Sequence, residues 1–316
     1  MDTLNQIYSS VSTRRRYEVW FLRMGLADGS GAWWLRYLLM NPGRAGCPDN
    51  PSGMPVQVWA TWFPSDGTPQ SFIQGFRLNS LQLSGRGQSP FHFRIGENEI
   101  GENACCGKLE VDGHKVSWDL HYRSTFAVTL SSKGWIGFSR SPHSNATFSG
   151  RITLDGREFH SEPLGFGVQG HNCGYRHRSF WTWAHAYFPN RDGSSSSVEA
   201  LAYDMPLGLV FRKAVLWHNG RQHVFRNLRE TKEDDEFAWT FRGSNKGGLS
   251  LDATFCGAEQ NIHRLPYLKT DCSGTFEVTN NSFASASVRV ERDGMPVEEL
   301  RTTNGAVLEI VGRQSQ

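Results

Sequence analysis

Residues 165–188 read GFGVQGHNCGYRHRSFWTWAHAYF and form the part of the chain that is densest in glycine, histidine and aromatic residues. The glycines Gly165, Gly167, Gly170 and Gly174 predict turns or a close approach of the backbone to another group. Residues 180–188 are β-branched, aromatic or small, which predicts a strand. Because side chains alternate along a strand, one face carries Trp181, Trp183, His185 and Tyr187. A row of rings with polar tips forms either an ordinary core or the wall of a cavity for an apolar ligand.

The remaining sequence favours an all-β protein. Its 316 residues suit two domains or one large β-fold, and it contains 33 glycines, 11 tryptophans and 20 phenylalanines. Short apolar segments recur at intervals of about ten residues with turn signals between them, which is typical of sandwiches and barrels. None of these segments has a convincing apolar stripe at helical spacing, so we expect few and short helices.

Charge and targeting signals restrict the partners. The formal net charge is +2, so nucleic acid is not an expected partner. The first residues contain no apolar segment of the secretory type, and no run approaches a membrane span. We therefore expect a cytoplasmic protein, with peripheral membrane contact and oligomeric state left open. The six cysteines have no disulfide-framework or metal-ligand spacing, which predicts free thiols.

A weak internal repeat suggests two domains. Tyr17 to Trp20 is followed by an Asp-Gly turn and an apolar return strand, and Phe180 to Trp183 is followed by the same pattern. A long loop rich in proline and glycine is expected over residues 41–55, and the Asn304-Gly305 pair predicts a hairpin turn. We place the boundary at the Asp155-Gly156 turn, which gives domains of residues 1–155 and 156–316.

Three segments carry a family resemblance. They are the Arg-Tyr-Glu-X-Trp-Phe strand at residues 16–21, the Val-Ser-Trp-Asp-Leu strand at residues 116–120, and the glycine-rich approach to Trp181-X-Trp183. In this order the motifs resemble the lipocalin-like superfamily. That superfamily contains carotenoid 1,2-hydratases (hydroxyneurosporene synthases), tocopherol cyclases, Diels-Alderase-type cyclases and AttH-like proteins.

The resemblance implies two lipocalin-like antiparallel barrels or sandwich halves in tandem, with a hydrophobic ligand in a barrel or between the halves. It further implies an enzyme that binds an apolar isoprenoid or polycyclic molecule, without a cofactor, and catalyses hydration, cyclisation or isomerisation of a carbon–carbon double bond. The alternative is a non-catalytic carrier or sensor of a lipid or terpenoid. A buried acid aimed into the pocket would distinguish the enzyme from the carrier.

Asp204 is the predicted proton donor, with Tyr203 and His185 tuning or relaying the proton. If Phe188 pairs with Val198, Asp204 lies opposite Thr182, off the ring-bearing face; a slip of one residue places it opposite Trp181. The structural alternative is that Asp204 caps the turn before Pro206. The predicted substrate-binding residues are Trp181, Trp183, Tyr187, Trp20, His171, His177 and Asn172.

Other chemistries have weaker signals. The spacing of His171, His177 and His185 matches no common metal-ligand motif, so no metal site is expected. Glu18 interrupts an aromatic strand close to several arginines, which predicts a structural ion pair. Nucleophile-elbow, P-loop and dinucleotide-binding motifs do not occur in the sequence.

Overall fold

The computed structural model describes residues 4–8, 15–41, 54–84, 90–132, 137–190, 193–231 and 237–312. These residues form strands and three short 3-10 turns, η3 (Leu78–Ser80), η4 (Pro206–Gly208) and η5 (Glu259–Asn261). The predicted all-β class is therefore confirmed. Much of the expected loop over residues 41–55 lies outside the described residues.

The first sheet has thirteen strands in the order β4-β3-β2-β1-β13-β11-β9-β8-β7-β6-β5, and β10 and β12 pair with β11. Its strands are β1 (Arg16–Leu26), β2 (Gly31–Asn41), β3 (Val56–Pro64), β4 (Gln70–Phe76), β5 (Leu81–Ser84), β6 (His92–Ile95), β7 (Asn98–Gly101), β8 (Ala104–Val111), β9 (His114–Arg123), β10 (Val128–Ser132), β11 (Gly137–Leu154), β12 (Arg157–His160) and β13 (Gly165–Gly174).

The second sheet has nine strands and closes into an eight-stranded barrel, because β19 pairs with β21 as well as with β18. Only β20 lies outside that ring. The strands of the second sheet are β14 (Trp181–Pro189), β15 (Ser195–Asp204), β16 (Val210–His218), β17 (Arg221–Thr231), β18 (Ala238–Ser244), β19 (Leu249–Cys256), β20 (His263–Leu268), β21 (Thr275–Arg292) and β22 (Met295–Val311).

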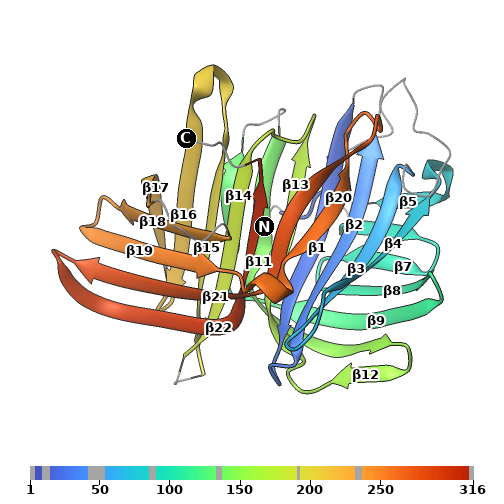
Figure 1. Ribbon diagram of the computed structural model, residues 1–316, viewed down its shortest axis with the longest axis horizontal. Helices are drawn as coiled ribbons and strands as arrows, with labels where there is room; N and C mark the ends of the chain where they lie inside the picture. The colour runs from blue at the N-terminus through green and yellow to red at the C-terminus, as the bar shows by residue number, and fades with distance from the viewer. Residues whose placement is uncertain are drawn as a thin grey trace.

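The two sheets have related connectivity and lie side by side, with β1, β13 and β14 near the centre (Figure 1). β1 lies between β2 and β13, the last strand of its sheet, and β14 lies between β15 and β22, the last strand of the chain. The prediction of two tandem β-halves is confirmed. The expected boundary at residue 155 falls in the turn between β11 and β12, whereas sheet membership changes between Gly174 and Trp181.

The glycine-rich stretch is a strand, β13, and not the series of turns that its composition predicts. It pairs with β1 on one side and β11 on the other, and none of its four glycines has a positive φ. The glycines instead allow close packing: a Cβ at Gly167 would lie 1.9 Å from the Arg23 carbonyl oxygen, and one at Gly170 would lie 2.1 Å from the Phe21 ring.

Alternation along β14 divides its side chains between two environments. Ala184, Ala186 and Phe188 pack inside the barrel. Trp183, from the other face, packs with Phe21 and residues of the first sheet, in a cluster that joins the two halves. The ring-bearing face of β14 is therefore the outer face of the barrel, turned toward the first sheet.

Two local predictions are wrong. Cys272 is disulfide-bonded, although Cys105, Cys106, Cys173 and Cys256 are free thiols as expected. The Asn304-Gly305 pair, which resembles a hairpin turn, lies inside β22. Within the described part of the chain, no helix has the length and apolar character needed to cross a membrane.

Candidate functional site

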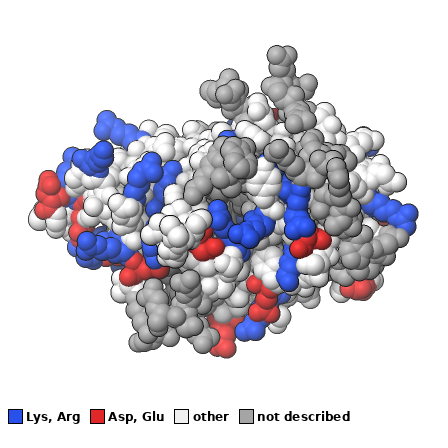
Figure 2. All heavy atoms as spheres, turned by 90° about the horizontal axis from the view of Figure 1, so that it is seen from above, with Lys and Arg blue, Asp and Glu red and all other residues white. Residues whose placement is uncertain are grey.

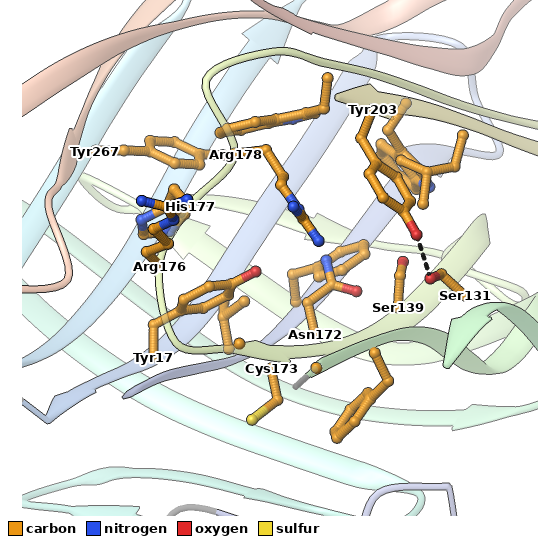
Figure 3. A pocket seen from close by; sticks show the side chains of 18 of the residues that line it. Tyr17, Ser131, Ser139, Asn172, Cys173, Arg176, His177, Arg178, Tyr203 and Tyr267 are labelled. Atoms are coloured by element: carbon orange, nitrogen blue, oxygen red, sulfur yellow. Dashed lines mark hydrogen bonds between the residues drawn. The ribbon is translucent and has the colours of Figure 1, made fainter. Parts of the chain in front are cut away.

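A cavity of about 700 Å³ lies between the two sheets, and both sheets contribute to its wall. Its position follows from strand alternation, since odd-numbered residues in the first part of β1 and of β14 line it, whereas even-numbered residues of both strands pack in the two cores. The side chains that line it include Tyr17, Val19, Phe21, Trp34, Arg36, Ser131, Phe138, Ser139, Asn172, Arg176, His177, Arg178, Trp181, Trp183, Leu201, Tyr203, Tyr267 and Glu309 (Figure 3).

One end of the cavity is an apolar wall of three rings. Phe21 stacks on Trp34 with ring centroids 5.5 Å apart, and Trp183 meets both rings edge-on at 5.4 and 5.8 Å. Leu201 and Tyr203 on β15 extend this wall, and the Tyr203 hydroxyl is hydrogen bonded to Ser131 of the first sheet at 2.8 Å. Such a surface suits a rigid apolar ligand.

The other end carries a buried carboxylate. Glu309 on β22 accepts hydrogen bonds from Trp181 Nε1 at 2.8 Å, from the Tyr267 hydroxyl at 2.7 Å and from Asn280 Nδ2 at 3.3 Å. Both carboxylate oxygens are therefore used by neutral donors. In this arrangement Glu309 acts as an acceptor.

His177 lies on the connection between β13 and β14 and stacks on Tyr17, with ring centroids 4.2 Å apart. Burial, assisted by the positive charge of Arg36, lowers the pKa of His177 to about 3, so the imidazole is neutral near neutral pH. Burial raises the pKa of Tyr17, so its hydroxyl also remains neutral. The acidic and basic side chains that line the cavity, apart from His177, are thus Glu309 and the arginines Arg15, Arg36, Arg176 and Arg178.

A second cavity of about 640 Å³ adjoins the first, and the segment of residues 176–178 lines both. Its wall carries charged side chains, among them Lys269, Asp271 and Asp204, beside apolar ones such as Phe276. Asp271 forms an ion pair with Arg15 at 3.6 Å. Lysine and arginine side chains surround a hollow near the middle of the molecule when it is seen from above (Figure 2).

Asp204 lines this second cavity and not the ring-walled one. Phe188 pairs with Ser196, so neither predicted register is correct, and Asp204 lies beyond Trp181 at the level of Phe180. Its Oδ1 accepts a hydrogen bond from the Phe180 amide at 3.0 Å. The carboxylate therefore fixes the end of the β14–β15 pair, and its hydrogen-bond donor is the Phe180 amide and not an amide of the turn before Pro206 that the structural alternative named.

The other predicted residues separate into two groups. Trp181, Trp183, Tyr203, Asn172 and His177 line the cavity. His185 is instead fully buried, with Nε2 2.7 Å from the Ser144 carbonyl oxygen of β11, and burial lowers its pKa to about 3. Tyr187 stacks on Phe166 at 4.8 Å.

Trp20 and His171 belong to the core of the first sheet, where their rings stack at 4.7 Å. His171 is hydrogen bonded to Glu18 at 2.8 Å, and both side chains are fully buried. Glu18 therefore takes part in a buried pair with His171, and Arg14, one of the neighbouring arginines, lies outside the described residues. One of those arginines, Arg23, donates its hydrogen bonds to carbonyl oxygens of the second sheet.

Sequence reasoning missed Arg36, Tyr267 and Glu309. Each is a polar or charged residue on a strand, and Arg36 and Glu309 stand within apolar runs. That interruption is the signal that was available, since a charged residue on a buried strand needs a local reason. Among the described residues, no group of three or more histidine, cysteine, aspartate or glutamate side chains could hold a metal ion.

No protein-family model matches the sequence, and no curated protein matches it. Solved structures match over almost the whole chain. CghA with Sch210972 aligns with a TM-score of 0.59 at 12% identity, covering 94% of this chain and 88% of CghA. Kievitone hydratase from Nectria haematococca aligns with a TM-score of 0.51 at 11% identity, covering 98% of this chain and 94% of the hydratase.

The chain therefore has the tandem lipocalin-like β-fold that its motifs resemble. It shares that fold with CghA and with kievitone hydratase. At these identities the likeness concerns the fold alone.

Proposed function

We propose that the protein binds an apolar isoprenoid or polycyclic small molecule in the cavity between its sheets and catalyses cyclisation at a carbon–carbon double bond. The observation that carries this proposal is the three-ring wall of Phe21, Trp34 and Trp183, to which both sheets contribute. A cavity of about 700 Å³ is large enough to enclose such a ligand. The names of two proteins of this fold, one solved with Sch210972 and one a hydratase, are consistent with small-molecule chemistry.

The arrangement of polar groups around the cavity favours cyclisation by positioning of the substrate over proton-initiated cyclisation. A shaped apolar wall holds a flexible polyene in a reactive conformation, which reduces the entropy lost on reaching the transition state. Proton-initiated chemistry would need an acid aimed into the cavity. The Asp204 carboxylate accepts a hydrogen bond from the Phe180 amide, and the Glu309 carboxylate accepts three hydrogen bonds. Neither group is placed as such an acid. In this proposal Trp181, Trp183, Tyr203, His177 and Asn172 contact the ligand.

Hydration is the second candidate function, and Glu309 is the observation that favours it. A carboxylate in the cavity wall can accept a proton from water as the water oxygen adds to one carbon of a polarised double bond, and can then return that proton to the other carbon. A non-catalytic carrier would use the same wall without changing its ligand. Mass spectrometry after incubation with polyene compounds separates the three: unchanged mass with a new retention time indicates cyclisation or isomerisation, gain of one water indicates hydration, and unchanged compound indicates a carrier.

Cavity filling tests the site itself. Leu201 lines the cavity, so Leu201→Trp should prevent binding of methyl parinarate, a neutral fluorescent polyene, while the protein still unfolds cooperatively. The matched control is Leu209→Trp, because Leu209 is 58% exposed and does not line the cavity. Equal binding of methyl parinarate by wild type and Leu201→Trp would reject the proposed site.

Location is a separate proposal. A cytoplasmic protein was expected, but the disulfide at Cys272 favours an oxidising compartment. Alkylation of thiols in denaturant immediately on cell lysis, with and without reductant, would decide the point, since Cys272 is buried in the folded protein and in a cytoplasmic protein it should be alkylated without reductant.

A further inference from the structure

Arg36 is a buried cation that forms no ion pair with any residue that the structure describes. It lies on β2, is 4% exposed and lines the cavity, and its Nη1 is buried without a hydrogen-bond partner. Its guanidinium lies over the Tyr267 ring at 3.9 Å and the Trp59 ring at 4.7 Å. Aromatic faces compensate part of the cost of removing a cation from water, but a buried charge ordinarily has an ionic partner.

Glu309 does not supply that partner. Its oxygens accept hydrogen bonds from Trp181, Tyr267 and Asn280, and no ion pair within 4.0 Å joins it to Arg36 in the described chain. The Tyr17 hydroxyl cannot become a counter-ion near neutral pH, because burial raises its pKa.

A second guanidinium adds to the positive charge. Arg178 is half-buried above the Tyr203 ring at 5.0 Å, and it points toward Asn172 across the middle of the cavity (Figure 3). Neutral His177 contributes no compensating charge. The described wall of the cavity thus carries the guanidiniums of Arg15, Arg36, Arg176 and Arg178 and one carboxylate, Glu309, which already accepts three hydrogen bonds.

We propose that the ligand carries a carboxylate, which Arg36 and Arg178 bind while the apolar body of the ligand packs against the Phe21, Trp34 and Trp183 wall. This inference rests on the proposed function and specifies its substrate class. Trp34 and Arg36 lie one strand period apart on β2, so a single extended molecule can reach both. A guanidinium is suited to this role because its N–H groups match the two oxygens of a carboxylate.

The test compares cis-parinaric acid with its methyl ester, which differ only in the charged group. Wild-type protein should bind the acid more tightly than the ester. Arg36→Met should weaken binding of the acid by about 10- to 100-fold and change binding of the ester by less than about threefold. Arg36→Lys should recover part of the acid binding. Arg242→Met is the control, because Arg242 is exposed and pairs with Asp252 away from the cavity.

Arg178→Gln provides a second, less buried variant and should weaken acid binding in the same direction. Arg36→Met should also retain the thermal stability of wild type, because it removes an uncompensated buried charge. Equal affinity of wild type for acid and ester, or equal loss of both probes in Arg36→Met and Arg178→Gln, would overturn the carboxylate inference and leave the apolar site standing. Failure of wild type to bind either probe would overturn the proposed site and the inference together.

Discussion

His185 lies on the same face of β14 as Trp181 and Trp183, but it contacts the first sheet and does not line the cavity. Its ring is fully buried, and its Nε2 lies 2.7 Å from the Ser144 carbonyl oxygen of the first sheet. Next to it, Glu199 accepts a hydrogen bond from Ser141 Oγ at 2.7 Å, and burial raises its pKa. These polar side chains tie the barrel to β11 beside the cavity.

A pH dependence of stability follows from His185. Its pKa is about 3 in the folded protein and about 6.5 in the unfolded chain, so protons bind preferentially to the unfolded state as pH falls below about 6.5. Between pH 7.5 and pH 5 the histidine should cost about 2 kcal/mol of the free energy of unfolding. Urea denaturation of His185→Gln should lack this part of the pH dependence. Parallel pH profiles for wild type and variant would contradict the burial of a neutral imidazole.

The sequence predicted the aromatic residues of the cavity wall better than it predicted which carboxylate lies in that wall. Trp181, Trp183 and Tyr203 could be chosen because strand alternation fixes which side chains share a face. The position of Asp204 depends on how β14 pairs with β15, and the intervening loop does not specify that register. Glu309 lies more than one hundred residues away from this hairpin in sequence, so its approach to Trp181 is a property of the closed barrel.

At the scale of elements, β13 and β1 are held in close contact by the absence of side chains. The Cβ that would clash at Gly167 meets backbone, which cannot move aside as a flexible side chain can. The same close approach brings the residues of β13 and β1 that line the cavity, such as Asn172 and Val19, onto neighbouring strands.

Gly167→Ala should therefore lower the free energy of unfolding by about 2 kcal/mol or more, because overpacking forces the strands apart. Gly101→Ala is the matched control, since its nearest atom to an added Cβ is 3.5 Å away and its φ is not positive. Guanidinium denaturation measures both changes. Equal midpoints for the two variants would indicate that β1 and β13 can separate without cost.

Individual strands were predictable where apolar segments are bounded by turn signals, as at β1 and β2, which flank the Asp28-Gly29 turn. Composition was misleading at β13, because glycine permits close strand packing as readily as it permits turns. The prediction of a hairpin turn at Asn304-Gly305 was wrong for a related reason. A turn signal acts only where the chain is free to reverse, and both sides of that pair are fixed within the strand β22.

At the scale of the molecule, Arg23 joins the two halves. This fully buried side chain on β1 donates hydrogen bonds to the carbonyl oxygens of Ser282, Asn304, Gly305 and Ala306 on β21 and β22, at 2.6 to 3.0 Å. Four acceptors of the barrel therefore depend on one residue of the first sheet. Because the cavity wall comes from both sheets, its shape depends on that junction.

Arg23→Met should lower the free energy of unfolding by about 3 kcal/mol or more, because it leaves buried carbonyl oxygens without donors. It should also weaken binding of methyl parinarate, although Arg23 does not line the cavity. Denaturation and fluorescence titration measure the two effects, and Arg242→Met should change neither appreciably. Loss of stability with unchanged probe affinity would indicate that the wall is held by other contacts.

The two faces of β14 also limit how this protein can change over time. One face fills the barrel with alanines and Phe188, and the other presents Trp181 and Trp183 to the cavity. A substitution can alter either face without touching the other. Insertion or deletion of one residue would exchange them, sending rings into a space shaped for methyl groups and leaving the binding wall bare. The sequence of β14 can therefore vary while its length stays fixed. New specificities should arise in this strand by substitution and not by insertion or deletion.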